Sequence, residues 1–434
     1  MPEASDRPVI TGLGAVTPIG LSFPAFTAAL RRGVSGTHAL PPDSRCESTA
    51  AATVGLPVER DGSEPSHPGA AFDPASVLSA SELKRVPRLV PMALAAANEA
   101  LAHAGLGPED RAGMGLILGT GGGGIDFTLT QADRVHHDRP PSLWTITNAT
   151  HGNLAGELSI ALGLRGPSLC VSTGCASSID ALGHAADLLR SDRAGAPDAM
   201  LVVGADAHVR WETLKGMELL GVISKRKHGD HASAHTASRP FDATRDGFVL
   251  GEGAWAVVLE RTERCVQRRG LPLAELLGYG ATCDAHHRVR PDPEPAEASR
   301  AMLDAMRDAA LEPGDIGLVH AHGTATPIND ALETAAIRHA FGEHADRLRI
   351  TSVKSMIGHP QGASGLAAVA ATLAGLLADD PFVSPTINLN EPDPACDLGY
   401  TPHEAVAAEA DVAMINCLAF GAKNSAVLVR ARRA

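Results

Sequence analysis

The chain alternates short apolar runs with longer stretches in which alanine, leucine and other apolar residues recur at helical spacing. Short apolar runs bounded by glycine, proline and polar residues are typical of buried β-strands, and the longer periodic stretches are typical of helices. We expect strands within residues 8–20 and near residues 115–118, 169–172, 199–203, 273–278, 316–319, 348–353, 413–417 and 425–430. The predicted helices are residues 23–32, 82–105, 177–191, 295–311, 331–341 and a last one from residue 365. This order indicates an α/β fold.

Each half of the chain contains a strand, a turn of small residues and an alanine-rich helix. The first half has SLCVSTGCASS at residues 168–178, and the second has RITSVKSMIGHPQGASG at residues 349–365. The two segments match in pattern rather than in identity. We therefore predict two similar halves, residues 1–262 and 263–434. Residues 46–79 are rich in proline, serine, glycine and acidic side chains, and they are expected to form an irregular surface segment.

Cys175 lies in the predicted tight turn between a strand and a helix. Small residues on both sides allow a sharp turn that exposes a nucleophile at a helix N-terminus. The helix dipole favours a thiolate by about 0.3–1 kcal/mol, which lowers a thiol pKa of about 8.5 by less than one unit. A second activating group, most simply a histidine, is therefore expected. From the turn alone, a buried structural cysteine is an equally good interpretation.

Composition narrows the class of protein. The 434 residues are 44% hydrophobic and 20% charged, which is typical of a globular protein with a large core. Seven scattered cysteines indicate reduced thiols, and a net charge of −13 argues against general nucleic-acid binding. The most apolar helix, residues 365–378, is too short to span a membrane, and the start of the chain does not resemble a signal peptide. We expect a cytoplasmic protein with no nucleic-acid or membrane partner.

Three segments of the second half end strands in reactive or loop-forming residues. They are AHGTATP at 321–327, VKSMIGH at 353–359 and NCLAFG at 416–421. Open α/β sheets place ligands beyond the C-terminal ends of their strands, where these loops would meet. A cysteine with two histidines there indicates acyl transfer. The glycine run 119–124 lacks the Lys-Ser/Thr of a phosphate-binding loop, so close backbone packing is the preferred interpretation.

Four ordered motifs carry a specific resemblance. They are TGCASS at 173–178, HGTAT at 322–326 followed by Asn329, Asp330 and Glu333, KSxxGH at 354–359, and FGxxN at 420–424. With these motifs the chain resembles, over nearly its whole length, the elongating β-ketoacyl-acyl carrier protein synthases of the thiolase-like superfamily. The resemblance implies a five-layered αβαβα fold made of two similar halves, a dimer, and a decarboxylative Claisen condensation.

The resemblance also implies a role for each motif residue. Cys175 would take an acyl group from a carrier protein or coenzyme A, and His322 and His359 would stabilise the enolate formed when malonyl carrier protein loses carbon dioxide. The backbone N–H groups of Cys175 and Phe420 would form an oxyanion hole. Lys354 would be a further catalytic residue that organises the site electrostatically with Glu333. Glu333 and Asp330 would give structural support, and Thr324 and Thr326 would contact the pantetheine arm.

Partners and cofactors are likewise implied by the resemblance. Lys84, Arg85 and Arg88 lie where the family carries residues that dock an acidic acyl carrier protein, although a solvated charged face is a comparable interpretation. No metal or other cofactor is implied, because the substrates arrive on the phosphopantetheine of the carrier protein. The dimer partner is either an identical chain or a chain-length-factor-like subunit.

The closing loop departs from the family pattern. Leu418, Ala419, Ala422 and Lys423 stand where Phe, Gly, Gly and Thr are common. Alanine at a position that needs positive φ costs about 1 kcal/mol, so we expect the movement of this loop and the pocket shape to depart from the family pattern. We favour a ketosynthase of secondary metabolism, in a polyketide or polyene pathway, over one of fatty-acid elongation. The alternatives are a non-catalytic chain-length factor, against which Cys175 and both histidines argue, and a degradative thiolase.

Overall fold

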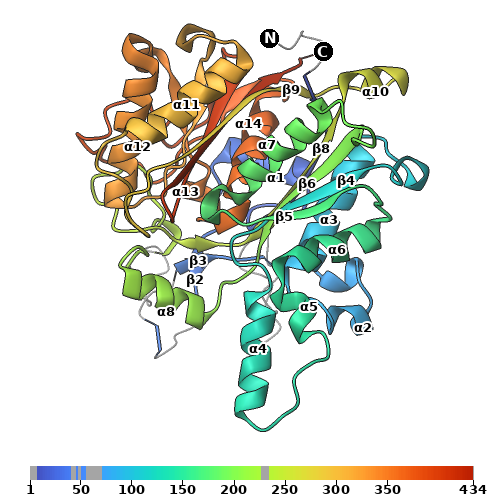
Figure 1. Ribbon diagram of the computed structural model, residues 1–434. Coiled ribbons are helices and arrows are strands. Elements are labelled where there is room, and N and C mark those ends of the chain that lie inside the picture. The colour runs from blue at the N-terminus through green and yellow to red at the C-terminus, as the bar shows by residue number, and fades with distance from the viewer. Residues whose placement is uncertain (1–6, 41–44, 47–49, 55–70, 226–233, 434) are drawn as a thin grey trace.

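The framework of the protein is a ten-stranded mixed sheet (Figure 1). The computed structural model describes residues 7–40, 45–46, 50–54, 71–225 and 234–433. Within them the strand order is β11-β10-β14-β15-β9-β1-β8-β6-β4-β5. The strands are β1 (Val9–Val16), β4 (Gly115–Gly119), β5 (Ser168–Val171), β6 (Ala199–Asp206), β8 (Gly253–Glu260), β9 (Ala274–Cys283), β10 (Leu318–His320), β11 (Arg349–Thr351), β14 (Val412–Ala419) and β15 (Lys423–Ala431).

The two halves of this sheet repeat one topology. The first half runs β5-β4-β6-β8-β1 and the second runs β11-β10-β14-β15-β9, so each strand has a counterpart at the same position and in the same chain order. Three strands of each half are parallel and the remaining two are antiparallel additions. The halves join where β1 pairs with β9 at Val9–Glu275 and Ile10–Ala274. The predicted similarity of the two halves is confirmed, and the exact boundary at residue 262 stays a prediction.

Helices form three layers around the two halves of the sheet. In Figure 1, α3 (Leu89–His103) and α6 (His151–Leu162) cover one outer face, and α11 (Ala296–Ala309) and α12 (Pro327–Phe341) cover the other. Between the two halves of the sheet lie α7 (Ser177–Arg190) and α14 (Ser364–Leu376), each of which contacts strands of both halves. The result is the predicted αβαβα order of layers.

The two central helices approach each other closely at their first turns. Every residue of α14 is buried, as its alanine-rich sequence predicts. A Cβ built on Gly365 would lie 2.7 Å from the backbone nitrogen of Ile179 in α7, so only glycine fits at this crossing. Because α7 follows Cys175 and α14 follows His359, this contact brings the two candidate residues together.

Two predictions about local structure are wrong. The helix expected over residues 82–105 is split into α2 (Ala80–Leu83) and α3, because Pro87 lacks a backbone N–H and disfavours helical geometry in the residue before it. The segment expected to be irregular contains β3 (Ala50–Ala52), a buried strand that pairs with β2 (His38–Ala39) and β7 (Leu250–Gly251). Residues 47–49 and 55–70 of that segment lie outside the described residues.

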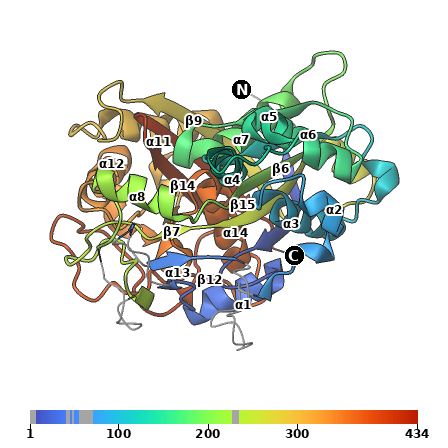
Figure 2. The same ribbon diagram turned by 90° about the horizontal axis from the view of Figure 1, so that it is seen from below.

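The remaining elements connect this framework. They are α1 (Phe23–Arg32), α4 (Ile125–His136), α5 (Thr145–Ala149), α8 (Trp211–Leu220), α10 (Thr262–Gln267), α13 (Lys354–Ile357), β12 (Phe382–Val383) and β13 (Val406–Ala407). Figure 1 shows α4, which the sequence pattern did not predict, projecting away from the sheet, and Figure 2 shows the same helix nearly end-on from below. Among the described helices, none has the length and apolar character that crossing a membrane requires.

Candidate active site

A cavity of about 480 Å³ contains the candidate nucleophile and both candidate histidines in its wall. Cys175, His322 and His359 line it together, although they come from three separate segments of the chain. Their sulfur and one ring nitrogen of each histidine all lie within 4.8 Å of one another. The outer wall is mainly apolar with two basic side chains, and it includes Leu219, Leu220, Phe248, His287, Val289, Arg290, Pro291, Ile328 and Phe420.

Cys175 is held in a single 3-10 turn, Gly174–Ala176, between β5 and α7. Gly174 has a φ of 67°, in the left-handed region that favours glycine. The Ser177 hydroxyl accepts a hydrogen bond from the Thr173 backbone N–H and donates to the Gly174 carbonyl oxygen, which closes the turn. The Cys175 residue is 3% exposed, so its thiol sits at the bottom of the cavity rather than at the protein surface.

His359 contacts the cysteine directly. Its Nε2 lies 3.0 Å from the Cys175 Sγ, and its Nδ1 lies 2.9 Å from the Ser364 Oγ. The His359 backbone N–H donates to the Val249 carbonyl oxygen, and Phe248 packs edge-on against the imidazole. The ring is therefore fixed on both edges and on one face, with Nε2 aimed at the sulfur.

His322 follows β10 and is positioned by two ionisable residues. Glu333 of α12 accepts hydrogen bonds from the backbone N–H groups of His322 (2.6 Å) and Gly323 (2.8 Å). The Lys354 Nζ lies 3.4 Å from the His322 Nδ1. Because the ammonium group of Lys354 can only donate, Nδ1 accepts here and the ring proton of His322 belongs on Nε2. The charges of Lys354 and Glu333 influence each other's pKa, although the two side chains do not form a direct ion pair.

The resting site is electrically neutral at its reacting atoms. Burial, together with the charge of Lys354, lowers the pKa of His322 and of His359 far below the usual value, so both rings are neutral imidazoles. Burial raises the pKa of the Cys175 thiol to about 11, although Lys354 acts in the opposite direction. The thiolate that the helix dipole suggested is therefore not the resting form, because burial outweighs the dipole.

Two backbone N–H groups also face the sulfur. Those of Phe420 and Cys175 both lower the pKa of the thiol by hydrogen bonding, which places them where an oxyanion on an attached acyl group would form. Phe420 follows β14, and the next backbone N–H, that of Gly421, donates to the Arg288 carbonyl oxygen. Ala422 has a φ of 64°, so the loop keeps the left-handed conformation that the usual glycine would favour.

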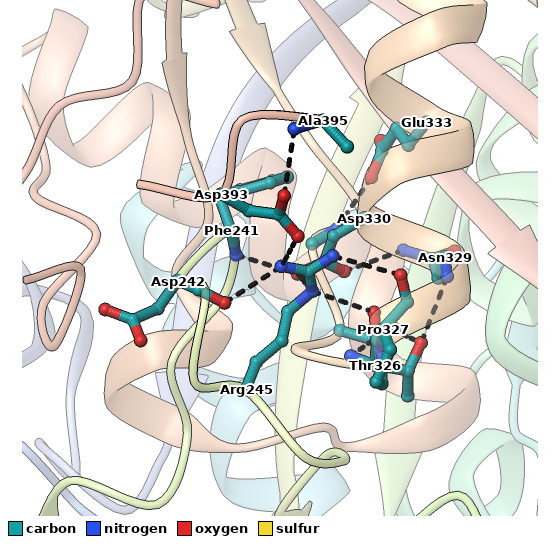
Figure 3. A network of polar contacts seen from close by, with 12 residues as sticks. Phe241, Asp242, Arg245, Thr326, Pro327, Asn329, Asp330, Glu333, Asp393 and Ala395 are labelled. Atoms are coloured by element: carbon teal, nitrogen blue, oxygen red, sulfur yellow. Dashed lines mark hydrogen bonds and ion pairs between the residues drawn. The ribbon is translucent and has the colours of Figure 1, made fainter. Parts of the chain in front are cut away.

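Thr324 and Thr326 line the same cavity, with their hydroxyl oxygens 3.0 Å apart. Thr326 also caps α12 by accepting a hydrogen bond from the Asn329 backbone N–H. Figure 3 shows how Arg245 holds this corner: it donates to the carbonyl oxygens of Thr326 and Pro327. The network extends to Asp393, which pairs with Arg245, and to Asp330, which accepts from the Phe241 backbone N–H.

The three basic residues assigned to carrier docking differ in their surroundings. Lys84 and Arg85 are exposed at the end of α2. Arg88 donates to the buried Glu252 carboxylate at 2.8 Å, and this interaction raises the pKa of its guanidinium. Its side chain is 39% exposed, so most of the side chain is buried against Glu252 and only a minor part can contact a docked carrier protein.

Two residues that hold the site were missed by sequence reasoning. Asp206, at the end of β6, accepts from the backbone N–H groups of Gly121, Gly122 and Gly362, and so ties the glycine run to the loop after His359. This is the close backbone packing that was preferred over a phosphate-binding loop. Ser364, the partner of the His359 Nδ1, is the second. No motif or spacing in the sequence marks either residue.

The distances among Cys175, His322 and His359 would also suit a metal ion. The buried Lys354 beside His322 opposes that use, since its charge would repel a divalent cation. The expectation that no metal is needed stays a prediction.

The chain matches one family of proteins along most of its length. Residues 6–264 match the N-terminal domain of the beta-ketoacyl synthases, and residues 273–390 match the C-terminal domain. The chain belongs to the β-ketoacyl synthase family. This synthase is 34% identical to the 3-oxoacyl-[acyl-carrier-protein] synthase 2 of Coxiella burnetii, with 98% of each chain covered. It is 36% identical to the protein of the same name from Synechocystis, with 96% of each covered.

Solved structures agree with this assignment. A beta-ketoacyl synthase from Burkholderia phymatum superimposes with a TM-score of 0.86 at 29% identity, over 99% of this synthase and all of that chain. The ishigamide ketosynthase/chain length factor gives 0.84 at 29% identity. A type II polyketide synthase structure, of an acyl carrier protein in complex with its ketosynthase bound to the hexaketide, gives 0.86 at 27% identity. The predicted family is confirmed.

Proposed function

We propose that this synthase joins an acyl group held on Cys175 to a malonyl unit by decarboxylative Claisen condensation. The product is a β-ketoacyl carrier protein two carbons longer than the acyl group. The observation that carries the proposal is the convergence of Cys175, His322 and His359 on one cavity, within 4.8 Å at their reacting atoms. The names of the relatives, 3-oxoacyl-[acyl-carrier-protein] synthase 2, support the same reaction and a carrier-bound substrate.

The first step is acylation of Cys175. The sulfur attacks the thioester carbonyl of the incoming acyl carrier protein, and its proton passes to the Nε2 of His359, which lies 3.0 Å from the sulfur. The backbone N–H groups of Cys175 and Phe420 bind the oxyanion, and removing one such donor costs roughly 2.7–4 kcal/mol. The old sulfur–carbon bond then breaks, and Nε2 gives the proton to the departing pantetheine thiolate, which leaves as the thiol. Thr324 and Thr326 contact the pantetheine arm.

The second step is condensation. The malonyl carrier protein places its thioester oxygen between the Nε2 atoms of His322 and His359, whose ring centroids are 5.3 Å apart. Loss of carbon dioxide leaves an enolate that their N–H groups stabilise. Its carbon attacks the acyl carbonyl, the bond to the Cys175 sulfur breaks, and the released thiolate takes up a proton from solvent. Neutral histidines suit this step, because the lowered pKa values keep a hydrogen-bond donor without a competing charge.

The substrates bring the chemistry that the side chains lack. The thioester activates the acyl carbon, and loss of carbon dioxide generates the carbon nucleophile. We propose that no metal or further cofactor takes part, and that both acyl groups arrive on the phosphopantetheine of an acyl carrier protein. Lys84 and Arg85 are the exposed basic residues proposed to contact that carrier, and Arg88 supports their position through Glu252.

A dimer is proposed at the outer edge of the first half. Strand β5 is the last strand of the sheet and pairs with β4 on one side. Its Leu169 is 45% exposed, and Ile160 on the adjacent α6 is 80% exposed. Exposed apolar side chains on a free strand edge favour pairing with another chain. The partner is a second copy or a chain-length-factor-like subunit, and light scattering of the pure chain distinguishes the two.

The experiment that tests the function is intact mass spectrometry with acyl and malonyl carrier proteins. Wild type should gain one acyl adduct, which Cys175→Ala abolishes, and malonyl carrier protein should then convert the adduct into a ketoacyl product two carbons longer. The acyl chain accepted decides between the favoured polyketide or polyene pathway and fatty-acid elongation. No adduct across a broad acyl panel would contradict the proposal and support a non-catalytic chain-length-factor-like subunit.

A further inference from the structure

Three buried histidines of this synthase differ in what fixes their protons. The Nε2 of His320 accepts the Val353 backbone N–H at 3.1 Å, so its proton must sit on Nδ1, which faces the Thr372 hydroxyl at 3.0 Å. His322 is fixed the other way, because Lys354 donates to its Nδ1. Each of these rings therefore has a single tautomer.

His359 is held differently. On its Nδ1 side the hydrogen-bond partner is the Ser364 hydroxyl at 2.9 Å, and on its Nε2 side it is the Cys175 sulfur at 3.0 Å. A hydroxyl both donates and accepts, and so it satisfies Nδ1 with or without a proton. Ser364 is 1% exposed at the first position of α14, where solvent cannot replace it as a partner.

The proposed reaction needs both tautomers of His359. Before acylation the thiol carries its hydrogen and donates to Nε2, so the ring proton lies on Nδ1 and points to the Ser364 oxygen. The acylated sulfur carries no hydrogen, and Nε2 must then donate to the malonyl thioester oxygen. That tautomer leaves Nδ1 bare, and the Ser364 O–H turns to donate to it. Nε2 takes up a proton from water in the cavity, and the Nδ1 proton is released to water in a transient opening of the site, so the change moves no net charge.

We infer that Ser364 is a positioning residue that holds the His359 ring and lets it exchange tautomers between acylation and condensation. This inference rests on the proposed function for its purpose, but the exchange itself is a property of the free protein. Alkylating Cys175 with iodoacetamide removes the thiol hydrogen without any substrate. Alkylation should therefore move the His359 proton from Nδ1 to Nε2.

Nitrogen-15 NMR of histidine-labelled protein tests this directly, with the His359 signals assigned from His359→Gln. The wild-type ring should change tautomer on alkylation. In Ser364→Ala the His359 proton should lie on Nε2 both before and after alkylation, because a buried Nδ1–H would have no acceptor. Thr372→Val is the matched control. Thr372 lies on the same helix as Ser364, and its hydroxyl contacts a different buried histidine, His320, so its loss should leave the His359 exchange intact. A wild-type ring that does not change tautomer, or a Ser364→Ala ring that does, overturns the inference.

Kinetics supply the second readout. Ser364→Ala should lower kcat about 10-fold with KM unchanged within 2-fold, the size of effect seen when the partner of a functional histidine is removed. Ser364→Thr keeps a hydroxyl and should restore most of the rate. Thermal unfolding gives the fraction of each variant that is folded. If the Ser364→Ala rate falls only as much as that fraction falls, Ser364 serves packing and does not position His359. If wild type forms no product, the proposed function fails, while the NMR result still decides the role of Ser364.

Discussion

The electrostatics of Cys175 can be tested without any substrate. Burial raises the pKa of its thiol to about 11, whereas a cysteine in water ionises near pH 8.5. Each pKa unit corresponds to about 1.4 kcal/mol, so the site opposes the free thiolate by about 3 kcal/mol relative to water. At pH 8 about one molecule in 1,000 should carry a thiolate, against about a quarter of the molecules for an ordinary cysteine.

Alkylation by iodoacetamide measures this fraction, because only the thiolate reacts. We expect the rate constant for the Cys175 peptide, followed by mass spectrometry, to rise tenfold per pH unit from pH 6 to pH 10 without a plateau. The exposed Cys283 serves as an internal control for the reagent. Lys354→Met should lower the Cys175 rate at every pH, since Lys354 lowers the pKa of the thiol.

A plateau below about pH 9, or a constant rate between pH 6 and pH 8, would refute this reasoning. Such a profile belongs to a thiolate–imidazolium pair, in which His359 holds the proton before any substrate arrives. The Cys175→Ser variant, in which the labelled peptide disappears, confirms that the measured peptide is the right one. Measured in the same buffers, circular dichroism verifies that the protein stays folded up to pH 10.

Three further outcomes are expected. Charge reversal at Lys84 and Arg85 should raise KM for carrier-bound acyl groups and spare acylation by a small thioester; Arg347→Glu, on another exposed surface, is the control, and equal loss on both substrates would contradict docking. Gly365→Val should lower stability in urea unfolding by about 1–3 kcal/mol or more, because its side chain meets the backbone of α7. Burial raises the pKa of Glu333 to about 7, so the folded state holds its proton more tightly than the unfolded state does. The stability that this contributes is full below about pH 4.5 and is lost as the pH rises through 7. Glu333→Gln should therefore flatten the dependence of the unfolding free energy on pH between these values, and an unchanged slope would contradict a buried carboxyl group.

Local features of the fold were readable from the sequence because their causes are local. The first helix was predicted at its observed bounds, since Ser22 caps its N-terminus and Gly33 ends it in a left-handed conformation. The strand, turn and helix around Cys175 follow from a run of small residues. The signal for the helix break was present in Pro87 and was overlooked, because the apolar period continues across it.

Other features depend on contacts that no local pattern reveals. Asp206 and Gly362 are 156 residues apart, and their hydrogen bond exists only because β6 ends beside the first turn of α14. The raised pKa of Cys175 also depends on contacts that are distant in sequence. The helix dipole can be predicted from the sequence, but the burial that outweighs it cannot. Ser364 looks like a helix-start residue until His359 folds back against it.

The repeated topology explains why the site is divided between the halves. Strands β4 and β10 occupy the same position in their half-sheets, and the loop after each is held by one buried carboxylate that accepts from two consecutive backbone N–H groups. Asp206 binds Gly121 and Gly122 after β4, and Glu333 binds the residue pair beginning at His322 after β10. The two loops are therefore built in the same way and differ in the side chain they present.

That difference assigns the chemistry. In the first half the loop presents glycines that approach Gly362 and His208, and it contributes no side chain to the cavity, where Cys175 is the nucleophile of this half. In the second half the equivalent loop presents the imidazole of His322, and the turn before the equivalent helix presents His359. In the proposed reaction, one half therefore holds the acyl group and the other half supplies both hydrogen-bond donors for the enolate.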